Sequence, residues 1–218
     1  MGSGRRRVRA RHLAGAAVSD ALPPDVEQAM NAALAALDVA PDGWLDLPDR
    51  RRLRAAFGPW TPPYQPGGPD AGLFRRAALL VACARRALLR WEETFPTDRR
   101  PHELVDSVAP ALRGEIPEAE IDAAAEALRK DVEPLGVQPE RGDAFCAGFA
   151  AVHLPAEAWD GDLDPDIYEP ERRDRELDEP VVEALAAHAL AFEDPDGLRA
   201  YWRWYVTEAF PAAYRVTS

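Results

Sequence analysis

Six acidic residues lie close together in the C-terminal third of the chain, where carboxylates could bind a cation. They are Asp160, Asp162, Asp164, Asp166, Glu169 and Glu171. Counted from Asp160, acids occupy positions 1, 3, 5 and 12 of an EF-hand calcium loop. Position 6 of that loop needs the sharp turn that glycine makes, whereas this chain has Pro165, whose ring fixes φ near about −65°. We therefore prefer a solvated acidic loop or a partner-binding surface to a calcium site.

These six acids are too densely spaced to be buried, because each unpaired buried carboxylate would be very costly. Their mutual repulsion has no evident benefit in a purely structural loop, and a basic partner would relieve it. We predict that they face such a partner. Trp204, in the last predicted helix, is a second candidate contact, because it points away from the apolar face that its aromatic neighbours share.

No other residues form a recognisable catalytic or metal-binding motif. The four histidines are scattered, without an HExxH pair or a Cys/His cluster at zinc spacing, and neither a GxSxG elbow nor a Gly-rich phosphate loop is present. Cys83 and Cys146 lie in apolar helical contexts that are typical of small buried side chains in a reducing cytosol. We predict no catalytic residue, no metal and no cofactor. One alternative function is that of an enzyme, a helical metal-dependent hydrolase that uses the carboxylates of residues 157–179.

Charge is distributed unevenly along the chain. The 26 basic residues, of which Lys130 is the only lysine, and the 38 acidic residues give a net charge of −12. Residues 1–20 contain five arginines and one aspartate, a charge of +4, so residues 21–218 carry −16. We expect a disordered basic tail over residues 1–20. The acidity of the remainder argues against nonspecific nucleic-acid binding and is compatible with a basic protein partner.

The stretch from Asp70 to Glu103 contains the longest helical pattern in the sequence. Its apolar residues recur at steps of three and four, which places them on one face of a helix: Leu73, Ala77, Leu80, Val81, Ala84, Leu88, Trp91 and Phe95. Further apolar positions widen that face, so we predict a core helix with neighbours on more than one side. Paired arginines interrupt the apolar run well short of the ~20 residues that cross a membrane.

The remaining pattern is also helical, and no alternating run of β-branched residues indicates a strand. Helices are predicted at about 25–39, 49–57, 118–132, 143–153, 179–192 and 195–210, with one more ending near Leu112. Residues 58–70 form a long Pro-rich loop, whose Trp60 and Tyr64 we expect to pack back onto the domain, and residues 157–179 form a long acidic loop. The predicted fold is a single all-α domain over residues 21–218, a multi-helix bundle or helical array.

The segment from Phe95 to Pro101 combines a helix stop, an acid suited to capping and a proline suited to a first turn. We predict a structural junction in which Asp98 accepts backbone N–H groups at the start of the next helix. Arg100 is expected to pair with Glu92 or Glu93 across the turn.

Two blocks of the chain carry a family resemblance. One contains Trp91, Glu92, Phe95, Pro96, Asp98, Arg100 and Pro101, and the other contains Trp202 and Glu208 near the C-terminus. Together they resemble the immunity proteins numbered five among the bacterial polymorphic-toxin immunity families. The resemblance implies an α-helical cytosolic protein that protects its producer by binding a cognate toxin. It implies no active site.

The acidic composition is compatible with that function, since charged loops could complement a basic toxin such as a nuclease. A helical regulatory adaptor, with no toxin involved, is the remaining alternative. The neighbouring gene distinguishes these two hypotheses, because an immunity protein is expected beside the gene of its toxin.

Overall fold

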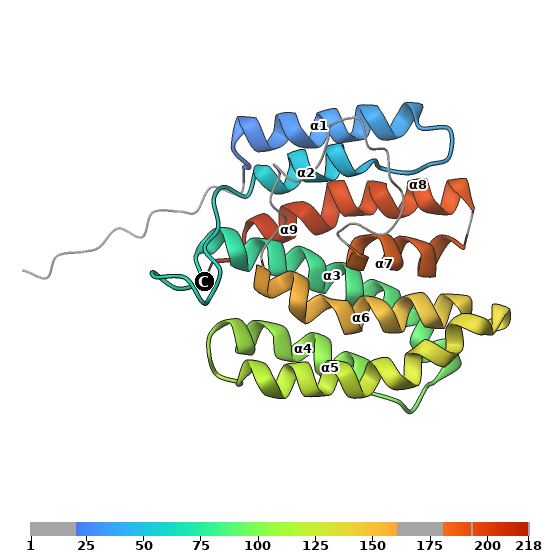
Figure 1. Cartoon of the computed structure of the whole chain (residues 1–218). Coiled ribbons are helices and arrows are strands. Elements are labelled where there is room, and N and C mark those ends of the chain that lie inside the picture. Colours follow the sequence, from blue (N-terminus) through green and yellow to red (C-terminus); the bar gives the residue numbers. More distant parts are fainter. Residues whose placement is uncertain (1–20, 161–180, 193, 218) are drawn as a thin grey trace, which may run out of the picture.

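The apolar stretch after Asp70 forms α3 (Ala71–Thr94), the helix around which the others pack (Figure 1). The Asp70 carboxylate accepts a hydrogen bond from the Leu73 backbone N–H at 3.0 Å, so it caps the helix. Helices α4, α6, α7 and α9 all contact α3, which confirms that it has neighbours on more than one side. Its arginines are not all at the surface, however, because the Arg76 side chain is buried.

The structure is a computed structural model and describes residues 21–160, 181–192 and 194–217. Every regular element in these ranges is helical, which confirms the predicted all-α class. Residues 1–20 and most of the predicted acidic loop lie outside the described residues. The Pro-rich segment 58–70 contains turns but no helix, as predicted.

The helices lie in stacked layers (Figure 1). Helices α6 (Gly142–Asp160) and α7 (Val181–Ala191) pack with α3 in the middle of the stack. On one side lie α4 (Arg100–Leu112) and α5 (Glu118–Val132). On the other side lie α1 (Pro24–Val39), α2 (Leu47–Ala55), α8 (Pro195–Trp204) and α9 (Phe210–Tyr214).

Prolines account for two departures from the predicted boundaries. Helix α6 continues through Pro155 to Asp160, because Leu154, Pro155 and Ala158 are buried and this packing outweighs the loss of one backbone hydrogen bond. The C-terminal helix is not continuous, since a π-helical turn (Tyr205–Ala209) separates α8 from α9. Pro211 has no N–H to donate to the carbonyl four residues earlier, and the widened turn accommodates its ring. Two short 3₁₀ turns, Glu133–Val137 and Pro139–Arg141, connect α5 to α6.

A buried carboxylate connects three elements that are far apart in sequence. Glu183 of α7 is fully buried and accepts hydrogen bonds from Arg54 Nε at 3.2 Å and from the Tyr205 hydroxyl at 2.6 Å. Arg50 Nη1 lies 3.5 Å from its other oxygen. Burial, followed by the negative charge of Glu183, raises the pKa of Tyr205 well above its usual value, so the hydroxyl remains a donor. This network fastens α2 and the C-terminal helix to α7.

We predict that Glu183→Ala lowers the free energy of unfolding by about 3–5 kcal/mol, because two arginines would remain buried without this carboxylate. Urea denaturation measures the loss. The matched control is Asp106→Ala, which removes a carboxylate paired with Arg85 at 2.7 Å on the surface. That variant should lose less than about 1 kcal/mol. Equal losses in the two variants would show that burial of the network contributes nothing.

The junction between α3 and α4 is built largely as predicted. Asp98 accepts the Arg100 backbone N–H at 3.1 Å, and its carbonyl accepts the Trp91 indole N–H at 3.2 Å. The expected pairing of Arg100 with Glu92 or Glu93 is wrong, because the Arg100 guanidinium turns back to Asp98 and also reaches Asp131 of α5 at 2.5 Å. Arg99, its neighbour, pairs with Glu92 instead.

We predict that Asp98→Ala costs about 1 kcal/mol of stability at neutral pH, because the carboxylate that accepts the Arg100 backbone N–H and guanidinium at the start of α4 is lost. Hydrogen bonds from the Arg100 side chain lower the pKa of Asp98 in the folded protein. A lowered pKa means that the stabilisation is present above the unfolded pKa of about 3.9 and disappears as pH falls through the folded value. Thermal melts from pH 7 to pH 3 should therefore show the gap between Asp98→Ala and the parent closing, while Thr97→Ala follows the parent throughout.

Candidate partner-binding groove

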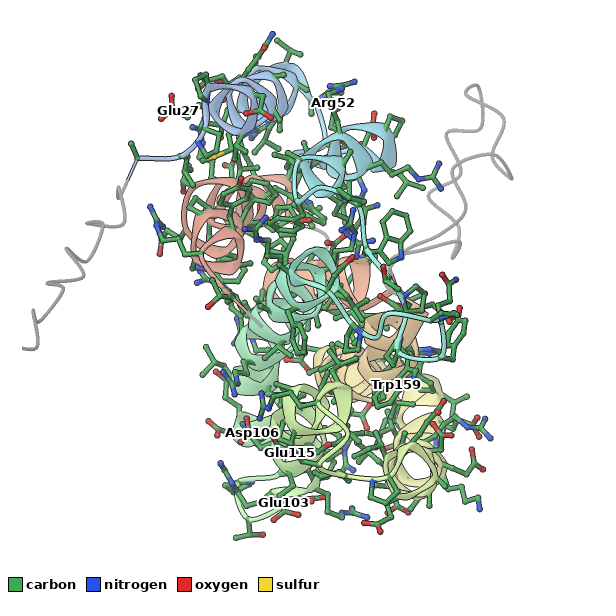
Figure 2. The ribbon with its side chains drawn as sticks, turned by 90° about the vertical axis from the view of Figure 1, so that its left-hand side faces the viewer. Glu27, Arg52, Glu103, Asp106, Glu115 and Trp159 are labelled. Carbon is green, nitrogen blue, oxygen red and sulfur yellow. The ribbon has the colours of Figure 1, made fainter. Side chains whose placement is uncertain are left out.

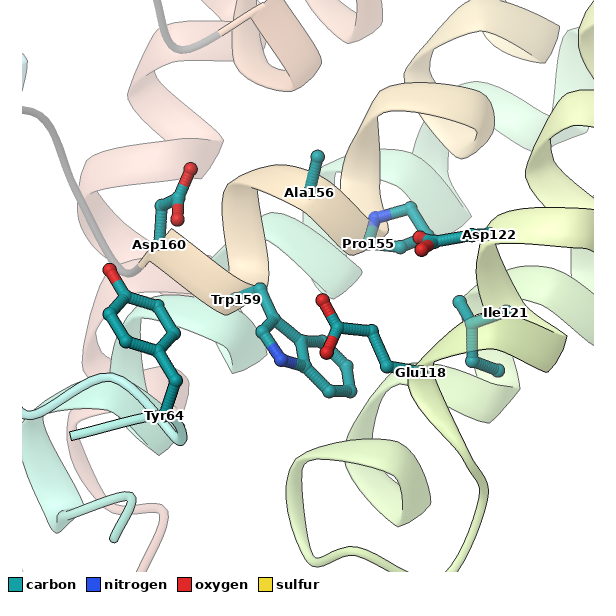
Figure 3. A pocket seen from close by; sticks show the side chains of 8 residues that line it. All are labelled: Tyr64, Glu118, Ile121, Asp122, Pro155, Ala156, Trp159 and Asp160. Carbon is teal, nitrogen blue, oxygen red and sulfur yellow. The ribbon is translucent and has the colours of Figure 1, made fainter. Parts of the chain in front are cut away.

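Two adjoining hollows lie at one end of the bundle, where the Pro-rich loop, the turn between α4 and α5 and the end of α6 meet. The smaller has a volume of about 180 Å³ and the larger about 580 Å³. Because Tyr64, Glu118 and Trp159 line both, the hollows form one groove, which we term the end groove. Figure 2 looks onto this end of the molecule, and Figure 3 shows the smaller hollow from close by.

One wall of the end groove is the Pro-rich loop, which is fastened to the helices beneath it. The Trp60 indole N–H donates to the Asp160 carbonyl at 3.1 Å, and the Trp60 ring lies 4.3 Å from the Arg76 guanidinium. Pro59 packs directly on Gly72 of α3, where an added Cβ would lie 1.9 Å from the Pro59 carbonyl oxygen. A larger residue at position 72 would therefore displace the loop.

Two aromatic rings face the end groove from opposite walls. Trp159 of α6 is half-buried, whereas Tyr64 of the Pro-rich loop is 68% exposed. The expectation that both loop aromatics pack back onto the domain thus holds for Trp60 but is wrong for Tyr64. The loop is held by its other residues, which leaves the Tyr64 ring free to stand beside the groove.

The charge at the groove is negative and uncompensated. The carboxylates of Glu118, Asp122 and Asp160 line the smaller hollow, and none forms an ion pair or side-chain hydrogen bond with another described residue. Figure 3 shows the Glu118 carboxylate beside the Trp159 ring and Asp160 above Tyr64. The one arginine in the lining, Arg113 at the larger hollow, is paired with Glu115 at 2.5 Å.

Of the acids predicted to face a partner, only Asp160 belongs to the described residues. It is exposed at the last position of α6 and lines the end groove. Asp162, Asp164, Asp166, Glu169 and Glu171 lie outside the described residues. Because the chain continues from Asp160 directly into them, the predicted acidic loop starts at the groove.

Trp204 does not meet Asp160, because no lining residue of the end groove comes from α8. Its half-buried ring lies 4.3 Å from the Arg86 guanidinium of α3 and 5.6 Å from the Tyr201 ring. Among the residues of the family blocks, Trp91 and Trp202 are buried in the core, whereas Glu208 and Pro96 are exposed. The blocks thus contain both core and surface residues.

Four acidic or aromatic residues that line the groove were not predicted to contact a partner. They are Tyr64, Glu118, Asp122 and Trp159. One available signal was the spacing of Glu118 and Asp122, since residues four apart share one face of a helix. Another was Tyr64, an aromatic residue at the centre of a run of prolines and glycines. No pattern in the sequence indicates that these two elements meet the end of α6.

The described residues contain no group of three or more His, Cys, Asp or Glu side chains placed to hold a metal ion. Both thiols are free, and burial raises the pKa of Cys146 to about 11 and that of Cys83 still further, so neither is an activated nucleophile. No helix in the described ranges is long and apolar enough to cross a membrane.

The fold and the groove define the class as an all-α protein with an acidic, aromatic-lined surface groove. The chain belongs to the Imm5 family, because the model of that family, described as Immunity protein Imm5, matches residues 30–212 of its 218. No curated protein matches the chain. Membership confirms the resemblance carried by the two sequence blocks, and it implies a cognate toxin as the partner.

We predict that Trp60→Phe loosens the Pro-rich loop, because the ring over Arg76 is kept while the N–H that bonds to Asp160 is lost. Backbone amides in residues 59–66 should exchange with solvent faster, by about the tenfold that one lost hydrogen bond of ~1 kcal/mol allows. The control is Trp204→Phe, since the Trp204 indole N–H bonds to no described residue. Unchanged exchange in Trp60→Phe would show that the loop is held by other contacts.

Proposed function

We propose that this Imm5 protein neutralises its cognate toxin by direct contact, through the end groove and the acidic segment that continues from it. The observation that carries the proposal is the set of three carboxylates without partners, Glu118, Asp122 and Asp160, beside two aromatic rings. Carboxylates that contribute no bond to the fold remain available to another molecule. Aromatic side chains are the residue type most enriched at protein interfaces.

The charge of the surface indicates the kind of toxin that fits. Residues 21–218 carry a net charge of −16, and residues 161–180 alone carry nine acids and three arginines. Negative charge at this density repels nucleic acid and attracts basic proteins. This attraction accelerates association with a basic partner. A basic toxin, for example a nuclease, is therefore the partner we propose. The protein would act in the cytosol of the producing cell by occupying the toxin, without catalysis of its own.

Neutralising the acidic segment tests this proposal. Asp160, Asp162, Asp164 and Asp166 changed together to asparagine should slow association with the toxin by about tenfold at low salt, with a smaller difference at high salt, because exposed charges act mainly on the encounter rate. Stopped-flow or surface-binding kinetics with the toxin from the neighbouring gene measure this, and protection of cells that express the toxin should weaken in parallel.

The control variant changes four exposed acids elsewhere in the chain, so that the net charge is the same. It combines Asp25→Asn, Glu27→Gln, Glu103→Gln and Glu140→Gln, which lie away from the end groove. If both variants slow association equally, net charge alone is responsible and the segment is not the contact surface. Calcium is added in a parallel series, since a melting temperature that rises with calcium only in the parent would instead support the EF-hand interpretation.

A further inference from the structure

We propose that the end groove binds an arginine side chain of the toxin, with its guanidinium between the rings of Tyr64 and Trp159 and facing the carboxylates of the smaller hollow. The identity of the partner rests on the proposed function, but the chemistry of the groove does not. The groove can therefore be tested with a peptide in the absence of any toxin.

Arginine side chains stack on aromatic rings at several other places in this protein. The Arg86 guanidinium lies 4.3 Å from the Trp204 ring, and that of Arg75 lies 4.4 Å from the Tyr214 ring. Within the described ranges no cation lies over Tyr64 or Trp159. These two rings thus present unoccupied faces of the kind that attract a guanidinium.

The acidic residues at the smaller hollow also favour a cationic ligand. Glu118 and Asp122 come from the first turns of α5 and Asp160 from the end of α6, so acidic residues of two helices line the smaller hollow, and the Glu118 carboxylate lies beside the Trp159 ring (Figure 3). All three belong to exposed residues, and no basic side chain of the described chain lines this hollow. A planar guanidinium can donate to carboxylates along its edge while its faces contact the rings, which an ammonium group cannot do.

The lining of the larger hollow favours an apolar residue beside the arginine. The larger hollow is lined mainly by apolar side chains, among them Pro63, Phe74, Leu112 and Ile116. It continues from the smaller hollow past Tyr64 and Trp159. The expected ligand is therefore an exposed segment in which an arginine is flanked by an apolar residue, with the apolar side chain in the larger hollow.

The test uses the full-length protein and a blocked leucyl-arginyl-leucine tripeptide. Titration is followed by the NMR signal of the Trp159 indole N–H, assigned by its absence in Trp159→Phe. The arginine peptide should shift this signal, while the same peptide with lysine binds about fivefold more weakly and the peptide with uncharged citrulline about tenfold more weakly. Equal binding of the arginine and citrulline peptides, or no binding at all, would overturn the proposal.

Variants identify the residues responsible. The double variant Glu118→Gln, Asp122→Asn should weaken binding of the arginine peptide by about tenfold. The double variant Glu120→Gln, Glu140→Gln makes the same change of charge at exposed acids outside the groove and should stay within about twofold. Tyr64→Ser should weaken binding by about fivefold, the size of one cation–π contact at a partly exposed site. A loss that is equal in the two double variants would overturn the site.

Two further outcomes separate this inference from the proposed function. If the arginine peptide binds but the Glu118→Gln, Asp122→Asn variant protects cells from the toxin as well as the parent, the groove does not contact the toxin, so the inference fails and neutralisation is left to the acidic segment alone. The other possible occupant is the basic tail of this chain. If the peptide binds only after Arg5, Arg6, Arg7, Arg9 and Arg11 are changed to glutamine in the full-length protein, the tail occupies the groove and the assignment to a partner is wrong.

Discussion

The fold depends on burying one carboxylate and two arginines together between α2, α7 and the C-terminal helix. None of these groups can be buried alone, because an ionised side chain without a partner is far more costly to desolvate than any apolar contact repays. Glu183, Arg54 and Arg50 therefore have to come into contact as the chain folds. Apolar helices can pack in several registers with similar energy, but only one register brings these charges together. We infer that the network selects that register, as buried polar groups do in other helical assemblies.

The same network also determines where the end groove forms. Arg54 pairs with Glu183 through its side chain, while its backbone carbonyl accepts a hydrogen bond from Arg76 at 3.0 Å. The Arg76 guanidinium in turn supports the Trp60 ring, and the Trp60 indole bonds to the end of α6 at Asp160. A continuous series of contacts thus runs from the buried carboxylate to the surface. The Pro-rich loop has no regular structure of its own, and this series gives it a defined position beside α6.

Sequence reasoning found the features that depend on local physics. The helical period located every long helix, because apolar residues three and four positions apart lie on one face of a helix. Predictions from the sequence failed where the burial of a residue depends on tertiary contacts. Arg50 and Arg54 of α2 are buried because they pair with Glu183, and no local pattern indicates this pairing, since Glu183 lies about 130 positions later. One signal was present, because Glu183 is the only acid within the otherwise apolar α7. The groove could not be foreseen, since three distant segments form it.

The charged residues of this protein thus fall into two groups, one that stabilises the fold and one that lies at the surface. The arginines and the acid that connect α2 to α7 are buried and pair with one another, whereas the surface keeps a large excess of acids, of which those at the end groove have carboxylates that bond to no other described residue. Replacing one of the groove carboxylates therefore changes the chemistry offered to a partner without removing a side-chain bond on which the helices depend. An immunity protein has to match one toxin, and toxins differ. A surface whose residues are independent of the core lets recognition change while the helical framework stays the same.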